Sequence, residues 1–229
     1  MKQIIKKTFQ FITRSQDPIN FASLKNVKPA SPIFGLDRGT PIDRYYIEKY
    51  ISDKSSYIRG KVLEVGDAEY TSKFNSRVQH SDILHAVDDG RTDIIVGDLT
   101  NINTLPKNSY DCFIAVQTLN FIFDLNQAII GANYLLKPGG VFIGSVSGIS
   151  QISRYDMERW GDFWRFTDLS IQRLLKSTFD GEINVQTYGN VLSSTAFLRG
   201  LVIEDLPNIE LLNESDADYQ MTICFSASK

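Results

Sequence analysis

Short apolar runs of strand length alternate with helical patterns through the middle of the chain, and this alternation limits the fold more than any other feature. Strands that alternate with helices pair in parallel, because each helix carries the chain back across the sheet in a right-handed crossover. We therefore predict five parallel strands. They are expected at residues 62–65, 78–81, 94–97, 112–116 and 141–146.

The last third of the chain has a different pattern. It predicts a helix over 168–179 with Thr167 as its N-cap, a strand over 183–188, a helical stretch over 192–206 and a final strand over 219–227. Two strands after five parallel ones indicate an α/β fold with a doubly wound, seven-stranded, mostly parallel sheet that is Rossmann-like. One such domain accounts for a chain of 229 residues.

The beginning of the chain differs from the rest in charge. We expect a basic helix and an arm over 1–40 and one domain over 41–229. Residues 1–13 combine lysines with apolar residues at helical spacing, which suits a packed amphipathic helix or weak contact with an anionic membrane surface or a partner protein. The sequence does not indicate an oligomeric state.

The net charge is −3 for the whole chain but about −8 for residues 31–229. A body of that sign is a poor partner for nucleic acid. We find no secretory signal and no apolar run of about 18 residues, so we expect a cytoplasmic protein without a transmembrane segment.

The cysteines and histidines do not predict a metal site. Cys112 and Cys224 each lie in an apolar run with no second cysteine nearby, which is typical of buried free thiols. His80 and His85 do not have the spacing of metal ligands, so we expect each to make a local hydrogen bond.

Acidic residues follow the first three predicted strands. Glu64 and Gly66 end the first strand, Asp82 follows the second, and Asp98 with Leu99 follows the third. Doubly wound sheets bind ligands at the carboxyl ends of their strands. A carboxylate after the second strand suits two ribose hydroxyls, and one after the third suits an adenine amino group.

Five motifs in order resemble the class I S-adenosylmethionine-dependent methyltransferases. The closest likeness is to the methyltransferase type 11-like enzymes associated with bacterial surface-glycan biosynthesis. The motifs are VLEVGD at 62–67, SD at 81–82, VGDL at 96–99, YDCFIAVQTL at 110–119 and LLKPGGVFI at 135–143.

This resemblance implies S-adenosyl-L-methionine as cofactor and assigns residues to it. Glu64 and Gly66 would shape the pocket for the methionine end, Asp82 would bind the ribose hydroxyls, and Asp98 would contact adenine. The remaining expected cofactor contacts are Asp67, Leu99 and Gln117.

The first motif departs from the family's glycine-rich pattern E-x-G-x-G-x-G. Ala68 and Tyr70 stand where the second and third glycines are expected. Glycine at such positions permits positive φ and close approach of a ligand to the backbone. Tyr70 must therefore point away from the cofactor or stack on it.

A segment after the fifth strand, residues 154–167, contains both tryptophans of the chain. Aromatic faces stack on sugar rings and arginine holds charged groups, so we predict that Trp160, Trp164 and Arg165 contact the substrate. Asp162 is our first candidate for a catalytic base and Asp156 the second. The alternative for Asp162 is a structural bond to Arg165 or to a backbone amide.

The resemblance implies methylation of a hydroxyl on a sugar, a glycan precursor or another small molecule. A binding protein that keeps the fold without activity is one alternative, because the glycine motif is eroded. An NAD-dependent oxidoreductase is another, but residues 66–71 lack the G-x-G-x-x-G fingerprint that admits a pyrophosphate.

Overall fold

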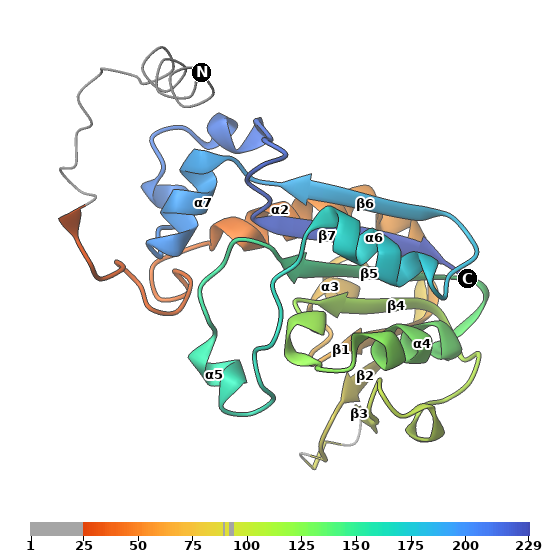
Figure 1. The fold of residues 1–229 in the computed structure, drawn as a ribbon. Helices are drawn as coiled ribbons and strands as arrows, with labels where there is room; N and C mark the ends of the chain where they lie inside the picture. Colours follow the sequence, from red (N-terminus) through yellow and green to blue (C-terminus); the bar gives the residue numbers. More distant parts are fainter. Residues whose placement is uncertain (1–24, 89, 92–93) are drawn as a thin grey trace, which may run out of the picture.

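The computed structural model describes residues 25–88, 90–91 and 94–229, which form a seven-stranded sheet with helices on both faces (Figure 1). The strand order is β3-β2-β1-β4-β5-β7-β6. Strands β1 to β5 are parallel, and β7 is antiparallel to both neighbours, which confirms the predicted fold. The strands are β1 (Gly60–Val65), β2 (Val78–His85), β3 (Ile94–Val96), β4 (Tyr110–Val116), β5 (Leu136–Ser147), β6 (Ile183–Tyr188) and β7 (Thr222–Ser228).

The helices cover the two faces of the sheet in separate layers (Figure 1). Helices α4 (Leu125–Leu135) and α6 (Asp168–Lys176) pack on one face, in a core with Phe113, Phe142 and Phe225. The other face is covered by α2 (Ile42–Asp53), α3 (Glu69–Lys73) and α7 (Val191–Leu198).

Two local predictions hold in this architecture. Cys112 and Cys224 are buried and form no disulfide, and burial raises the pKa of both thiols. Thr167 is the N-cap of α6, because its hydroxyl accepts a hydrogen bond from the amide of Ser170.

Several predicted boundaries are wrong. The fifth strand begins at Leu136 instead of residue 141, and the helix expected over 168–179 ends at Lys176. The second strand continues to His85 instead of ending at residue 81, because Ile83, Leu84 and His85 pair with β3. The helical stretch expected over 192–206 ends at Leu198, since Gly200 has a φ of 67° and turns the chain. The last strand begins at Thr222, three residues after the predicted start.

The described part of the arm, residues 25–40, packs against the chain that follows α7. The guanidinium of Arg38 binds Asp205 at 2.9 Å, and the hydroxyl of Thr40 donates to Glu204 at 2.9 Å. These contacts fix the arm beside the start of α2. The prediction for residues 1–13 lies outside the described residues, and no helix in the described ranges is long and apolar enough to span a bilayer.

Candidate functional site

A cavity of about 640 Å³ opens at the carboxyl ends of the parallel strands, as expected for a doubly wound sheet. Its volume lies within the usual range for small-molecule sites. Residues from the ends of β1, β3 and β4 meet there, together with the loop after β5 that contains α5 (Arg154–Met157). Of the predicted site residues, the cavity brings together Gly66, Asp98, Leu99, Gln117, Asp156 and Trp160.

Gly66 gives this cavity room for a ligand close to the backbone. Its φ is 85°, and no atom lies within 4 Å of the place that a Cβ would occupy. A side chain there would be strained and would project into open space. This glycine therefore fits a bound cofactor at the end of β1, as the sequence predicts.

Glu64 does not line the cavity but supports the loop that follows β1. Its carboxylate accepts hydrogen bonds from the amides of Tyr70 and Thr71 and from the hydroxyl of Thr71 at 2.7 Å. Burial raises the pKa of Glu64, although these hydrogen bonds act against the shift. Its contribution to a cofactor site is to hold the turn between β1 and α3.

The missing glycines are explained by the path of the chain after Gly66. Ala68 has a φ of −93°, which any residue adopts, so no glycine is required there. Tyr70 points away from the cavity into the core beneath α2, and its hydroxyl accepts a hydrogen bond from Arg44 at 2.7 Å. Asp67 is exposed, accepts the amide of Ala68 and does not line the cavity.

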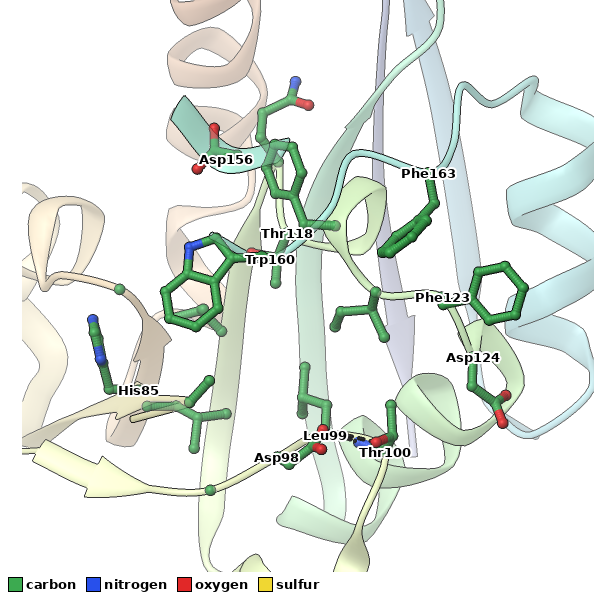
Figure 2. A pocket seen from close by; sticks show the side chains of 18 of the residues that line it. His85, Asp98, Leu99, Thr100, Thr118, Phe123, Asp124, Asp156, Trp160 and Phe163 are labelled. Atoms are coloured by element: carbon green, nitrogen blue, oxygen red, sulfur yellow. Dashed lines mark hydrogen bonds between the residues drawn. The ribbon is translucent and has the colours of Figure 1, made fainter. Parts of the chain in front are cut away.

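Asp98 and Leu99 form the opposite side of the cavity from Asp156 and Trp160 (Figure 2). One carboxylate oxygen of Asp98, Oδ1, accepts the amide and the hydroxyl of Thr100, both at 2.8 Å. No hydrogen bond to Oδ2 is found among the described residues. This oxygen is free to accept a donor such as an adenine amino group.

Asp82 does not lie at the carboxyl end of β2, so the reasoning that made it a ribose ligand is wrong. It lies within the strand, opposite Leu63, and outside the cavity. Its carboxylate binds Lys61 at 3.0 Å and accepts the hydroxyl of Tyr110 at 2.8 Å. Burial alone would raise the pKa of Asp82, but hydrogen bonds led by Lys61 outweigh it and hold the pKa below its usual range.

We expect Asp82→Asn to lower the free energy of unfolding by about 1–2 kcal/mol, because charge-assisted hydrogen bonds that join three strands are weakened. The depressed pKa makes this contribution present at neutral pH and lost as the pH falls below about 4. Urea denaturation at pH 7 and at pH 3 measures the difference. A variant as stable as the parent at pH 7 would contradict this assignment.

His85 lies at the carboxyl end of β2, where sequence reasoning placed Asp82. Sequence reasoning did not select His85. It is the last residue of β2 and lines the cavity beside Trp160 (Figure 2). Its Nδ1 lies 3.0 Å from the carbonyl oxygen of Val87. A carbonyl only accepts, so Nδ1 carries the proton and Nε2 of the neutral ring is an acceptor. Each histidine makes a local hydrogen bond, as predicted, since His80 binds Asp82.

A second cavity of about 460 Å³ lies between the arm, α2 and the loop after β5. It shares one wall with the first cavity, and Gln117, Phe121 and Asp156 line both. Asp156 accepts the hydroxyl of Ser153 at 2.5 Å and has no cationic partner among the described residues. A carboxylate therefore stands where the two cavities meet.

Asp162 and Arg165 line the second cavity as a pair. The guanidinium of Arg165 binds both oxygens of Asp162, and the amide of Ser153 donates to the same carboxylate at 3.0 Å. The side chain of Asp162 is only 1% exposed. Burial acts to raise the pKa of Asp162, but the bonds to Arg165 and Ser153 prevail and lower it, which weakens the carboxylate as a base. These contacts match the structural alternative.

The two tryptophans of the loop have different surroundings. Trp160 is 40% exposed at the rim of the first cavity, with its ring edge-on to His85. Trp164 lines neither cavity; its indole donates to the carbonyl of Ile122 at 3.1 Å and its ring stacks on Phe123. A substrate contact of Trp164 therefore has no support in this geometry.

Asp43, on the first turn of α2, is a third carboxylate that lines the second cavity, besides Asp156 and Asp162, and sequence reasoning did not select it. It is half-buried, and its one hydrogen bond found among the described residues comes from the amide of Arg44. Burial raises its pKa to about 6. Asp43 is far in sequence from the loop after β5, so no sequence pattern indicated that the two line the same cavity. In the described ranges no group of three metal-ligating side chains gathers.

The comparisons with known proteins agree with this arrangement. Residues 60–144 match the family described as a methyltransferase domain. The mitochondrial arginine-hydroxylase NDUFAF5 of Mus musculus is 28% identical over 159 residues, which are 64% of this chain and 41% of that protein. The chain thus spans about two fifths of the length of the curated relatives it matches.

Two solved structures share the fold at low sequence identity. An S-adenosylmethionine-dependent methyltransferase from Mesorhizobium loti superposes with a TM-score of 0.55 at 18% identity, over 85% of this chain and all of that one. The N-methyltransferase NodS from Bradyrhizobium japonicum, in complex with S-adenosyl-L-homocysteine, gives 0.51 at 13% identity, over 84% and 89%. Residues 60–144 are therefore similar to the methyltransferase-domain family, and the chain shares the fold of these solved S-adenosylmethionine-dependent methyltransferases.

Proposed function

We propose that the chain is an S-adenosylmethionine-dependent methyltransferase that methylates a hydroxyl group of a sugar or glycan precursor. The observation that carries this proposal is the common wall of the two cavities, formed by Gln117, Phe121 and Asp156. A methyl donor in the first cavity and an acceptor in the second would meet at this wall. Holding two reactants in such contact supplies much of the rate of a transfer reaction.

The first cavity has suitable groups for each part of S-adenosyl-L-methionine. Gly66 leaves space beside the backbone for the methionine end, and Nε2 of His85 suits a ribose hydroxyl. The free oxygen of Asp98 suits the adenine amino group, and Leu99 adds an apolar surface. In this proposal Glu64 and Asp67 act through the turn that positions Gly66.

The reaction needs a methyl donor and a place for one proton. Bound S-adenosyl-L-methionine supplies a sulfonium methyl group, whose bond to sulfur breaks as its bond to the acceptor oxygen forms. We assign the acceptance of the hydroxyl proton to Asp156; its place in the lining of both cavities, with no cationic partner among the described residues, supports this role. The pair of Asp162 and Arg165 fixes the loop that carries Asp156.

The second cavity offers polar and aromatic groups that suit a sugar. Asp43, Asp156 and Asn120 offer acceptors for hydroxyl donors, while Phe34 and Tyr155 offer aromatic faces. Of the three arginines that line this cavity, Arg44 is paired with Glu69 and Arg165 with Asp162, while Arg154 on α5 has no carboxylate partner among the described residues. With the likeness to glycan-associated enzymes, the acceptors and aromatic faces of this lining support a role in polysaccharide biosynthesis.

A second candidate function comes from the curated relatives, which are arginine hydroxylases. A shared fold does not fix the reaction, and the carboxylates of Asp43 and Asp156 in the second cavity are also compatible with a guanidinium substrate. The test is methyl transfer from labelled S-adenosyl-L-methionine to sugars, to glycan precursors and to arginine peptides, with mass analysis of each product. Labelled sugar supports the proposal. A peptide heavier by one oxygen, formed when O₂ and a two-electron reductant are also supplied, supports the alternative, and binding without any product supports a binding protein.

We expect His85→Ala to weaken S-adenosyl-L-methionine binding about fivefold, because one hydrogen bond to a ribose hydroxyl is lost. Isothermal titration calorimetry measures the change in Kd, with His80→Ala as the matched control, since that ring is exposed and lies outside the cavity. Asp82→Asn should leave the Kd unchanged. Weaker binding in Asp82→Asn with normal binding in His85→Ala would return the ribose contact to Asp82.

A further inference from the structure

Gln117 holds an unusual backbone conformation at the wall between the two cavities. It follows β4 directly and has a φ of 49°, a region that residues other than glycine seldom adopt. Its amide donates to the carbonyl of Ser145 at 2.9 Å, which fixes the residue there. Backbone strain that is held in this way concentrates at functional sites.

A single hydrogen bond, made by its oxygen, orients the side-chain amide of Gln117. Its Oε1 accepts the hydroxyl of Ser147 at 2.8 Å, so the Nε2 group is turned away from β5. Nε2 is buried and has no hydrogen-bond partner among the described residues. A buried donor without a partner is rare and costly, so the geometry indicates that a ligand completes it.

Which ligand can accept a hydrogen bond from Nε2 and still react depends on the chemistry of its acceptor atom. A hydroxyl oxygen has two lone pairs, so it can accept a hydrogen bond from Nε2 and still attack with the other pair. A neutral amine has one lone pair, and a hydrogen bond from Nε2 would occupy the electrons needed for attack. A protonated amine has none and would face the amide as a second donor.

We infer that Gln117 selects oxygen over nitrogen as the methyl acceptor, an inference that rests on the proposed methyltransferase function. Nε2 of Gln117 donates to the acceptor hydroxyl, and Asp156 receives its proton. The second lone pair then forms the new bond to the methyl carbon as the bond to sulfur breaks. This assigns the side chain to the acceptor, whereas the sequence pattern assigned Gln117 to the cofactor.

The direct test is the side-chain NH₂ signal of Gln117 in ¹⁵N-labelled protein, assigned with Gln117→Met. Saturating S-adenosyl-L-homocysteine is added first, and calorimetry establishes separately that it binds. Ethanol and ethylammonium, which is protonated at the pH of the experiment and therefore has no lone pair, are then titrated as the hydroxyl and amine probes. We expect the signal to shift with ethanol and to stay in place with the amine.

The outcomes separate this inference from the proposed function. Failure of S-adenosyl-L-homocysteine to bind would overturn both. If S-adenosyl-L-homocysteine binds, three results would overturn only the role of Gln117. These are a shift of the signal with S-adenosyl-L-homocysteine alone, a shift with the amine probe, and no shift with either probe.

A variant pair gives an independent measurement. Gln117→Glu keeps an oxygen for Ser147 but replaces the donor with an acceptor, and Gln186→Glu makes the same change at an exposed position of β6. We expect Gln117→Glu to lower methyl transfer to a glycan-precursor fraction at least tenfold, with the Kd for S-adenosyl-L-methionine unchanged and Gln186→Glu normal. Undiminished transfer in Gln117→Glu, or a tenfold weaker Kd, would sink the inference.

Discussion

Replacing Asp156 with asparagine is expected to slow methyl transfer by about 10²–10⁴-fold, because the acceptor hydroxyl loses the group that takes its proton. Asparagine keeps an oxygen for the hydrogen bond from Ser153, so α5 should remain folded. The Kd for S-adenosyl-L-methionine should change little. Initial rates at saturating donor, with calorimetry on the same preparation, measure both quantities.

The matched control is Glu158→Gln, which removes a carboxylate from the same loop at an exposed position outside both cavities. Its turnover should equal that of the parent protein. If Asp156→Asn also retained full turnover, no carboxylate at the common wall would be needed as a base. Proximity of the two reactants would then account for the rate.

Replacing Arg165 with alanine is expected to lower the free energy of unfolding by about 1.5–3 kcal/mol, the usual contribution of a charge-assisted hydrogen bond. The substitution leaves the carboxylate of Asp162 buried without its cation, and breaking one side of such a pair costs more than the pair itself contributes. Because the pKa of Asp162 is depressed, the difference should be full at neutral pH and shrink as the pH falls below about 4. Urea denaturation at the two pH values measures it.

The double variant with Asp162→Asn tests whether the two residues act as one unit. Coupled residues give a double variant that is less destabilised than the sum of the single variants. Asp162→Asn alone should retain turnover within a few-fold wherever it is folded, which separates it from Asp156→Asn. A loss of about 10² in turnover in folded Asp162→Asn would restore it as the catalytic base. Arg173→Ala, an exposed arginine on α6, is the control for the loss of a surface charge.

The features that the sequence predicted well are those set by local pattern. Apolar runs of fixed length specify strands, and the short connections between β1 and β4 specify parallel crossovers. The ends of β1 and β3 followed from this pattern, so Gly66, Asp98 and Leu99 were expected at one edge and are found there. The alternative pairing of Asp162 with Arg165 was also visible, because the two residues are three apart.

Prediction from local pattern failed where a residue interacts with partners that are distant in the sequence. Asp82 directly follows the strand predicted over 78–81 and so was interpreted as the residue after its end. In the structure Lys61 of β1 pairs with its charge, the hydroxyl of Tyr110 of β4 donates to it, and the strand continues to His85. A polar residue within a strand is stable when neighbouring strands supply its partners, and sequence spacing does not show which residues these are.

The sequence by itself determined the class of fold, the seven strands and the edge of the sheet at which the first cavity opens, since these follow from periodicity and connection length. Only the tertiary structure decided that Asp43 and Asp156 line one cavity, that Gln117 stands between two, and that Tyr70 turns into the core. Segments far apart in the chain meet there because the packing of every layer of the domain fixes their positions together. No local preference of these residues encodes that meeting.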